Sequence, residues 1–120
     1  IKEADIISLH FAETQKTKNF LNRKRINSIK SGALIISTVP NEITDLDALE
    51  TRLRKGDITF ITDHADELDP KDVERLSKYK NCILYPPIGY ISAEARIAKQ
   101  EIFLDNMESF LKGKPQNVVN

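Results

Sequence analysis

The sequence lacks, or has little of, several features that mark whole classes of protein. Its 120 residues contain no tryptophan, one cysteine and two separated histidines. A single cysteine, Cys82, cannot form an internal disulfide or a thiolate metal cluster, so we expect a buried thiol in a reducing compartment, by default the cytoplasm. Without ligand spacing around the histidines, the sequence predicts neither a metal centre nor a nucleophilic catalytic site.

Long apolar runs and an excess of one charge are also missing. No apolar stretch is long enough to predict a membrane span, and the first residues show no signal-peptide pattern. They also lack an initiator methionine, so we expect the start to be cut from a longer chain. Lys+Arg and Asp+Glu both number 18 and are interspersed, which excludes a basic surface for nucleic acid or an anionic membrane. The length favours one compact unit whose partners are small ligands or other proteins.

What the sequence does contain is a regular alternation of short apolar runs and amphipathic segments. The expected strands are 5–11, 33–38, 58–63 and 82–85. The expected helices are 22–29, from Thr44 or Asp45 to 55, 70–80, and from Ser92 to a stop at Gly113. This alternation predicts an α/β fold, a three-layer sandwich in which a mostly parallel sheet of about four strands carries helices on both faces.

In a parallel sheet of this kind, ligands bind at the carboxyl ends of the strands. The residues found there are His10, Thr38, Asp63 and Pro86. These strand ends are therefore the places where function is expected.

Six segments resemble, in order, the motifs of one enzyme family. They are 4–10 (ADIISLH for "ADhhxLH"), 31–38 (SGALIIST for "PGAhhINT"), 45–49 (DLDAL for "DexAL"), 62–63 (TD for "LDV"), 81–86 (NCILYP for "NVhLTP") and 113–120 (GKPQNVVN for "GKPxNVVN"). The chain resembles the D-2-hydroxyacid dehydrogenases, the family of phosphoglycerate, glycerate and D-lactate dehydrogenases. The resemblance implies that residues 1–120 are the C-terminal half of a Rossmann-type NAD-binding domain, with the glycine-rich half and the substrate domain absent.

The resemblance also implies which residues face the cofactor, NAD. Asp63 lies where the family's aspartate accepts a hydrogen bond from the nicotinamide carboxamide, and Thr38 ends the strand that lines the nicotinamide ribose. His10 occupies the family's position near the adenosine side. The four glycines form no G-x-G-x-x-G motif, so the pyrophosphate cradle is missing and any NAD site in this chain is partial.

The family's catalytic positions carry residues without the required chemistry. The arginine that orients the substrate is replaced by Pro40, and the acid–base histidine by Pro87. Counting places Leu68 at the glutamate that pairs with that histidine, although a loop shift could bring Glu67 or Asp69 there. We therefore expect no catalytic residue in this chain. His64 follows Asp63 directly, and since adjacent strand residues point to opposite faces, we expect no dyad between them.

Two functions stay open. The first is a part, or a degenerate copy, of an NAD-dependent oxidoreductase that keeps the fold but is catalytically inactive. The alternative is a non-enzymatic interaction or oligomerisation module derived from that fold. A half-domain exposes apolar surface, so we expect its partner to be a second copy of itself or the missing N-terminal half.

Overall fold

The computed structural model describes residues 1–89 and 91–119, which form two units. Unit 1 is Ile1–Pro87 and unit 2 is Ile88–Asn120. The sequence predicted one compact unit, so this expectation was wrong. Unit 1 carries all four strands, whereas unit 2 consists of one long helix with short flanking segments.

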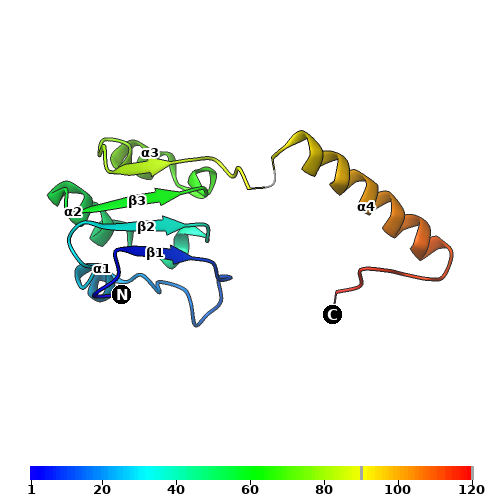
Figure 1. The fold of residues 1–120 in the computed structure, drawn as a ribbon, viewed down its shortest axis with the longest axis horizontal. Helices are drawn as coiled ribbons and strands as arrows, with labels where there is room; N and C mark the ends of the chain where they lie inside the picture. Colours follow the sequence, from blue (N-terminus) through cyan, green and yellow to red (C-terminus); the bar gives the residue numbers. More distant parts are fainter. Residues whose placement is uncertain (90, 120) are drawn as a thin grey trace. The chain divides into compact units, whose positions relative to one another are not determined.

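The sheet of unit 1 has the predicted parallel arrangement (Figure 1). Its strands are β1 (Ile6–Leu9), β2 (Ala33–Ser37), β3 (Ile58–Thr62) and β4 (Cys82–Leu84). They lie side by side in the order β1-β2-β3-β4, and every neighbouring pair is parallel. The connections contain the helices α1 (Arg23–Asn27), α2 (Leu46–Lys55) and α3 (Pro70–Leu76) and the short 3-10 turns η1 (Asn41–Ile43) and η2 (Ala65–Glu67).

Local signals fix where the longer helix of unit 1 begins and ends. The Asp45 side chain accepts a hydrogen bond of 2.9 Å from the Ala48 N–H, and so caps α2. Gly56 ends the helix in the left-handed conformation, with φ of 71°.

The prediction that α3 reaches Lys80 was wrong, because the helix ends at Leu76. Beyond it, the Tyr79 hydroxyl donates a hydrogen bond of 2.9 Å to Glu50 on α2. The Cys82 N–H bonds the Tyr79 carbonyl at 3.0 Å. The chain therefore enters β4 through a tight turn instead of another helical turn.

The core of unit 1 lies on one face of the sheet. Alternate residues of β2 and β3 are buried, and Ile35 and Phe60 pack in one cluster with Ile26 of α1, Leu49 of α2 and Leu76 of α3. Because helices α1–α3 share one cluster with one set of strand residues, they cover the same face.

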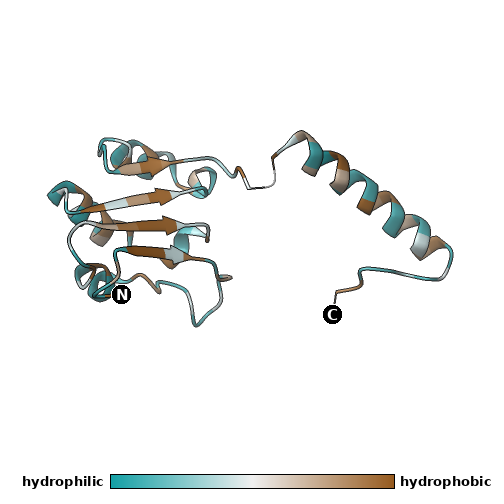
Figure 2. Ribbon diagram, in the orientation of Figure 1, coloured by the Kyte–Doolittle hydropathy of each residue, from teal (hydrophilic) through white to brown (hydrophobic). Residues whose placement is uncertain are grey.

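The opposite side of the sheet, which we call the open face, receives no helix from unit 1. Its apolar side chains are Ile6, Leu34, Ile36, Ile61 and Ile83. Leu34, Ile36 and Ile61 are half-buried, whereas 63% of Ile6 and 37% of Ile83 is exposed. Figure 2 shows how apolar the strands are. Unit 1 alone thus forms a sheet layer and one helix layer of the expected sandwich.

Unit 2 contains α4 (Ala93–Leu111), which the Ser92 side chain caps by accepting from the Ala95 N–H at 3.0 Å. The start of this helix was predicted correctly. None of the side chains of this helix is buried. The exposed apolar residues include Ile97, Phe103, Leu104, Met107, Phe110 and Leu111. No helix in the described part of the chain is long and apolar enough to cross a membrane.

Candidate functional site at the carboxyl edge of the sheet

The parallel ladder continues one residue beyond the strand ends. The N–H groups of Thr38 and Asp63 each donate a hydrogen bond of 3.3 Å to the preceding strand, and that of Tyr85 donates one of 2.8 Å. This continuation pairs His10 with Thr38, Thr38 with Asp63, and Asp63 with Tyr85. The three residues predicted to face the cofactor therefore lie in one row across the sheet. We call His10, Thr38, Asp63 and Tyr85 the edge row.

The edge row begins with a chain of hydrogen bonds around His10. Thr38 Oγ1 lies 2.9 Å from the Leu9 carbonyl oxygen and 2.9 Å from His10 Nδ1. A hydroxyl has one hydrogen, so when Thr38 donates to the carbonyl it must accept from Nδ1–H. His10 Nε2 lies 2.6 Å from the Ser8 hydroxyl oxygen, so both ring nitrogens are hydrogen-bonded. His10 and Thr38 remain exposed at the strand ends.

Asp63 has a carboxylate oxygen with no donor. Its Oδ1 is buried, and within the described residues it makes no hydrogen bond. Leaving a buried acceptor unpaired costs about 1–3 kcal/mol, and more for a charged group. Such an atom in a folded protein calls for an explanation, for instance a donor from outside the chain. The edge row therefore offers an unused acceptor beside exposed hydroxyl and imidazole groups.

His64 lies much closer to Asp63 than the sequence predicted. We expected opposite faces, but β3 ends at Thr62 and His64 has φ of −114° and ψ of 36°, so the strand alternation has stopped. Its Nε2 lies 3.8 Å from Asp63 Oδ1. Its Nδ1 lies 3.0 Å from Glu67 Oε1, three residues ahead. The expectation that His64 and Asp63 point to opposite faces was therefore wrong, but no hydrogen bond joins the two side chains.

The His64–Glu67 pair follows from the local backbone. His64 precedes η2, and a 3-10 turn brings side chains three residues apart onto one side. Asn41 Nδ2 donates a hydrogen bond of 2.6 Å to the His64 carbonyl and holds the turn against η1. The signal in the sequence was the spacing D-H-x-x-E, which becomes informative only once the strand is known to end before His64.

Pro40, Leu68 and Pro87, the residues that counting places at the family's catalytic positions, carry no acid, base or guanidinium group. Pro40 precedes η1 and Pro87 lies beyond β4, and neither side chain can donate or accept a hydrogen bond. Leu68 is buried in the core with 8% of its surface exposed. Of its acidic neighbours, Asp69 caps α3 by accepting from the Lys71 N–H at 3.1 Å, and Glu67 is the partner of His64.

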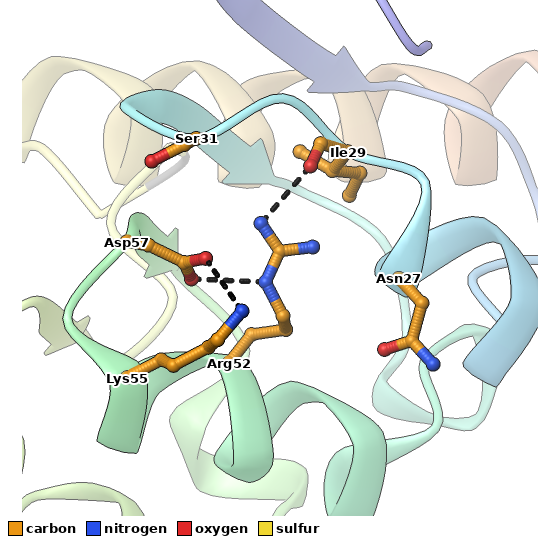
Figure 3. Close-up of a pocket in the computed structure, with 6 residues that line it drawn as sticks. All are labelled: Asn27, Ile29, Ser31, Arg52, Lys55 and Asp57. Carbon is orange, nitrogen blue, oxygen red and sulfur yellow. Dashed lines mark hydrogen bonds and ion pairs between the residues drawn. The ribbon is translucent and has the colours of Figure 1, made fainter.

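A cavity of about 380 Å³ lies at the amino end of the strands, away from the edge row (Figure 3). Its lining residues are Asn27, Ile29, Ser31, Arg52, Lys55 and Asp57. Arg52 Nε bonds Asp57 Oδ1 at 2.9 Å, and its other nitrogens donate to main-chain carbonyls. Burial disfavours the ionised Asp57, but the hydrogen bond and charge of Arg52 and the charge of Lys55 prevail and lower its pKa. The charged groups of this cavity are paired with one another and with main-chain carbonyls, so we interpret the cavity as structural.

Comparisons with known proteins show the family to which the chain belongs. Residues 1–89 match the family model described as "D-isomer specific 2-hydroxyacid dehydrogenase, NAD binding domain". The chain belongs to this family. It is 36% identical to a glyoxylate reductase of Thermococcus litoralis over 121 residues, covering 100% of the chain and 37% of that protein. It is 33% identical to a glycerate dehydrogenase of Methylorubrum extorquens, covering 99% of the chain and 39% of that protein.

A solved structure of the dehydrogenase family agrees with this assignment. The D-lactate dehydrogenase of Lactobacillus jensenii, determined with NAD+, superposes with a TM-score of 0.87 at 28% identity, and the match covers 99% of this chain and 40% of that one. The parallel sheet with its helices is thus the Rossmann-like α/β fold of the family. The chain spans about two-fifths of the length of these relatives.

Proposed function

We propose that this chain is the C-terminal half of the cofactor site in an NAD-dependent D-2-hydroxyacid dehydrogenase-like oxidoreductase, and that it is catalytically inactive. The observation that carries the proposal is the edge row, in which His10, Thr38 and Asp63 lie side by side and Asp63 Oδ1 is buried without a donor. A cofactor carboxamide is a donor of the required kind.

Three residues of the edge row have separate parts in binding. Asp63 accepts one carboxamide N–H and so fixes the orientation of the nicotinamide ring. Thr38 and His10, joined at 2.9 Å, present polar groups toward the ribose and adenosine sides. The bound NAD supplies the hydride chemistry, whereas these residues bind and orient.

The proposed inactivity rests on Pro40, Leu68 and Pro87. A positioned general acid–base group contributes about 10²- to 10⁴-fold to a rate, and proline supplies none. Without a guanidinium at position 40, the carboxylate of a 2-hydroxy acid also loses its planar, bidentate partner. The fold is therefore kept while the family's proton transfer and substrate orientation are lost.

Cofactor binding is tested by calorimetric titration of the chain with NADH. Asp63→Asn removes the anionic acceptor, and since hydrogen bonds to charged groups contribute about 1.5–3 kcal/mol, we expect at least a tenfold weaker Kd. Asp66→Asn is the matched control, because Asp66 is an exposed acid on the neighbouring turn η2. Equal affinities of the two variants contradict the proposed role of Asp63.

Inactivity is tested in a chimera in which this chain replaces the matching segment of the Thermococcus litoralis glyoxylate reductase. We expect NADH binding without glyoxylate reduction. Pro40→Arg and Pro87→His, introduced together, should restore measurable reduction. Turnover in the unmodified chimera contradicts the proposal.

A second candidate, an interaction module, is supported by the open face, where Ile6 and Ile83 expose apolar surface that unit 1 does not cover. We propose a second copy of the chain as its partner, working in the cytoplasm. Sedimentation at micromolar concentration tests this. Dimers that Ile83→Lys dissociates, with no NADH affinity, favour the module, and a monomer rules out self-association.

A further inference from the structure

The unpaired oxygen of Asp63 has a second potential donor inside the chain. His64 Nε2 is 3.8 Å from Asp63 Oδ1, beyond hydrogen-bond distance but within reach of a small ring rotation. Both side chains are about three-quarters buried, with 26% and 24% exposed. The oxygen proposed to receive the ligand therefore lies beside an imidazole.

The charge of His64 decides whether it competes for that oxygen. Glu67 Oε1 lies 3.0 Å from Nδ1, and its negative charge favours the tautomer that carries the proton on Nδ1. In the neutral ring Nε2 then presents a lone pair to the Asp63 carboxylate and cannot bond it. In the protonated ring Nε2–H is a donor placed between two carboxylates, and a charge-assisted hydrogen bond to Asp63 Oδ1 becomes available.

We propose that His64 is a positioning residue that makes Asp63 available to a ligand carboxamide only while its ring is neutral. Protonation turns the ring into a donor for Asp63 Oδ1, and the ligand amide loses its acceptor. Ligand affinity then falls as the pH decreases. The ligand in this inference is the nicotinamide carboxamide, so this part rests on the proposed function.

Among the described residues around His64, no other group ordinarily changes its charge between roughly pH 5 and 8. The turn η2 contributes Glu67 and Asp66, the β4 edge contributes Tyr85, and the contact from η1 is the neutral amide of Asn41. Histidine is the side chain that ordinarily changes charge between roughly pH 5 and 8. The direction of the pH dependence is therefore set by His64, and ligand affinity decreases when its ring is protonated.

The test compares NADH titrations at pH 8 and pH 5.5. If NADH binds only when His64 is neutral, the apparent Kd rises as the fraction of chains with neutral His64 falls. This rise is at most about tenfold per pH unit. We expect at least about fivefold weakening in the unaltered chain and in Asp66→Asn. In His64→Gln, whose side chain stays neutral, most of the pH dependence should disappear. A His64→Gln variant that keeps the full pH dependence overturns the inference.

A ligand-free measurement separates this inference from the proposed function. In ¹³C NMR titrations, the Asp63 carboxyl carbon should show an inflection at the same pH as the His64 ring, and His64→Gln should remove it. An Asp63 signal that does not respond to His64 overturns the coupling. A shared inflection without NADH binding at any pH upholds the coupling, and it overturns both the proposed function and the ligand part of the inference.

Discussion

Arg52 is the side chain whose removal should damage unit 1 most without touching the edge row. It lies on α2 with 6% of its surface exposed. Its guanidinium donates to the Ile26 carbonyl at 2.6 Å, to the Ile29 carbonyl at 2.9 Å and to Asp57 Oδ1 at 2.9 Å. One side chain thus joins α2 to the end of α1, the loop before β2 and the start of β3.

The expected cost of Arg52→Met follows from these three bonds. Removing one partner of a buried ion pair costs about 3–5 kcal/mol, and each buried carbonyl left unpaired adds about 1–3 kcal/mol. Asp57 keeps 21% exposure and has Lys55 at 3.6 Å, which lowers the penalty. We therefore expect a loss of about 3 kcal/mol, a large fraction of the 5–15 kcal/mol typical of a domain.

Urea unfolding followed by circular dichroism measures this loss. Arg54→Met is the matched control, because Arg54 lies on the same helix with 69% of its side chain exposed. Its contacts are long and exposed, 3.5 Å to Glu50 and 3.4 Å to the Tyr79 hydroxyl. We expect the control to unfold at the urea concentration of the unaltered chain and Arg52→Met to unfold far earlier. Equal midpoints for the two variants refute the account of Arg52.

Three further predictions follow from local geometry. The Arg52 and Lys55 charges lower the Asp57 pKa against the opposing effect of burial, so the stabilisation is present above the ordinary value of 3.8 and is lost as the pH falls through the lowered pKa. The difference in unfolding free energy between the unaltered chain and Asp57→Asn should therefore shrink below about pH 4. Burial raises the pKa of Cys82 to about 11, so alkylation by iodoacetamide at pH 8 should be slow until urea unfolds the chain, and fast labelling of the folded chain contradicts this. Gly56→Ala places a side chain at φ of 71° and should cost about 1 kcal/mol in urea unfolding, whereas Gly89→Ala, which has no positive φ, should change nothing.

Much of the fold could be predicted from residues with unambiguous local signals. Asp45, Gly56 and Ser92 mark helix ends by capping, which depends only on neighbours in sequence. The apolar runs of β2 and β3 predicted buried strands. Which face of the sheet the helices of unit 1 cover could not be predicted. In a continuous apolar run, a half-buried residue such as Ile36 and a buried one such as Ile35 look the same.

The site was predictable in part. Parallel strands bring their carboxyl ends to one edge, so His10, Thr38 and Asp63 could be placed together from the positions of their strands. The His64–Glu67 pair could not, since it depends on where β3 stops and on the 3-10 turn that follows. The alternation rule that separated His64 from Asp63 holds only while the backbone stays extended.

The residues at the carboxyl edge favour the proposed binding role over a purely structural one. Under that proposal, Pro40 and Pro87 stand just beyond the strands, where hydrogen-bonding groups of the family are expected. Asp63 is kept, although an acid with a buried oxygen lacking a donor destabilises the folded chain unless something pairs with it. A structural acid would be expected to have a partner, as Asp57 has Arg52 and Asp69 has the Lys71 N–H. The unpaired oxygen is therefore explained best by a donor that arrives with a ligand.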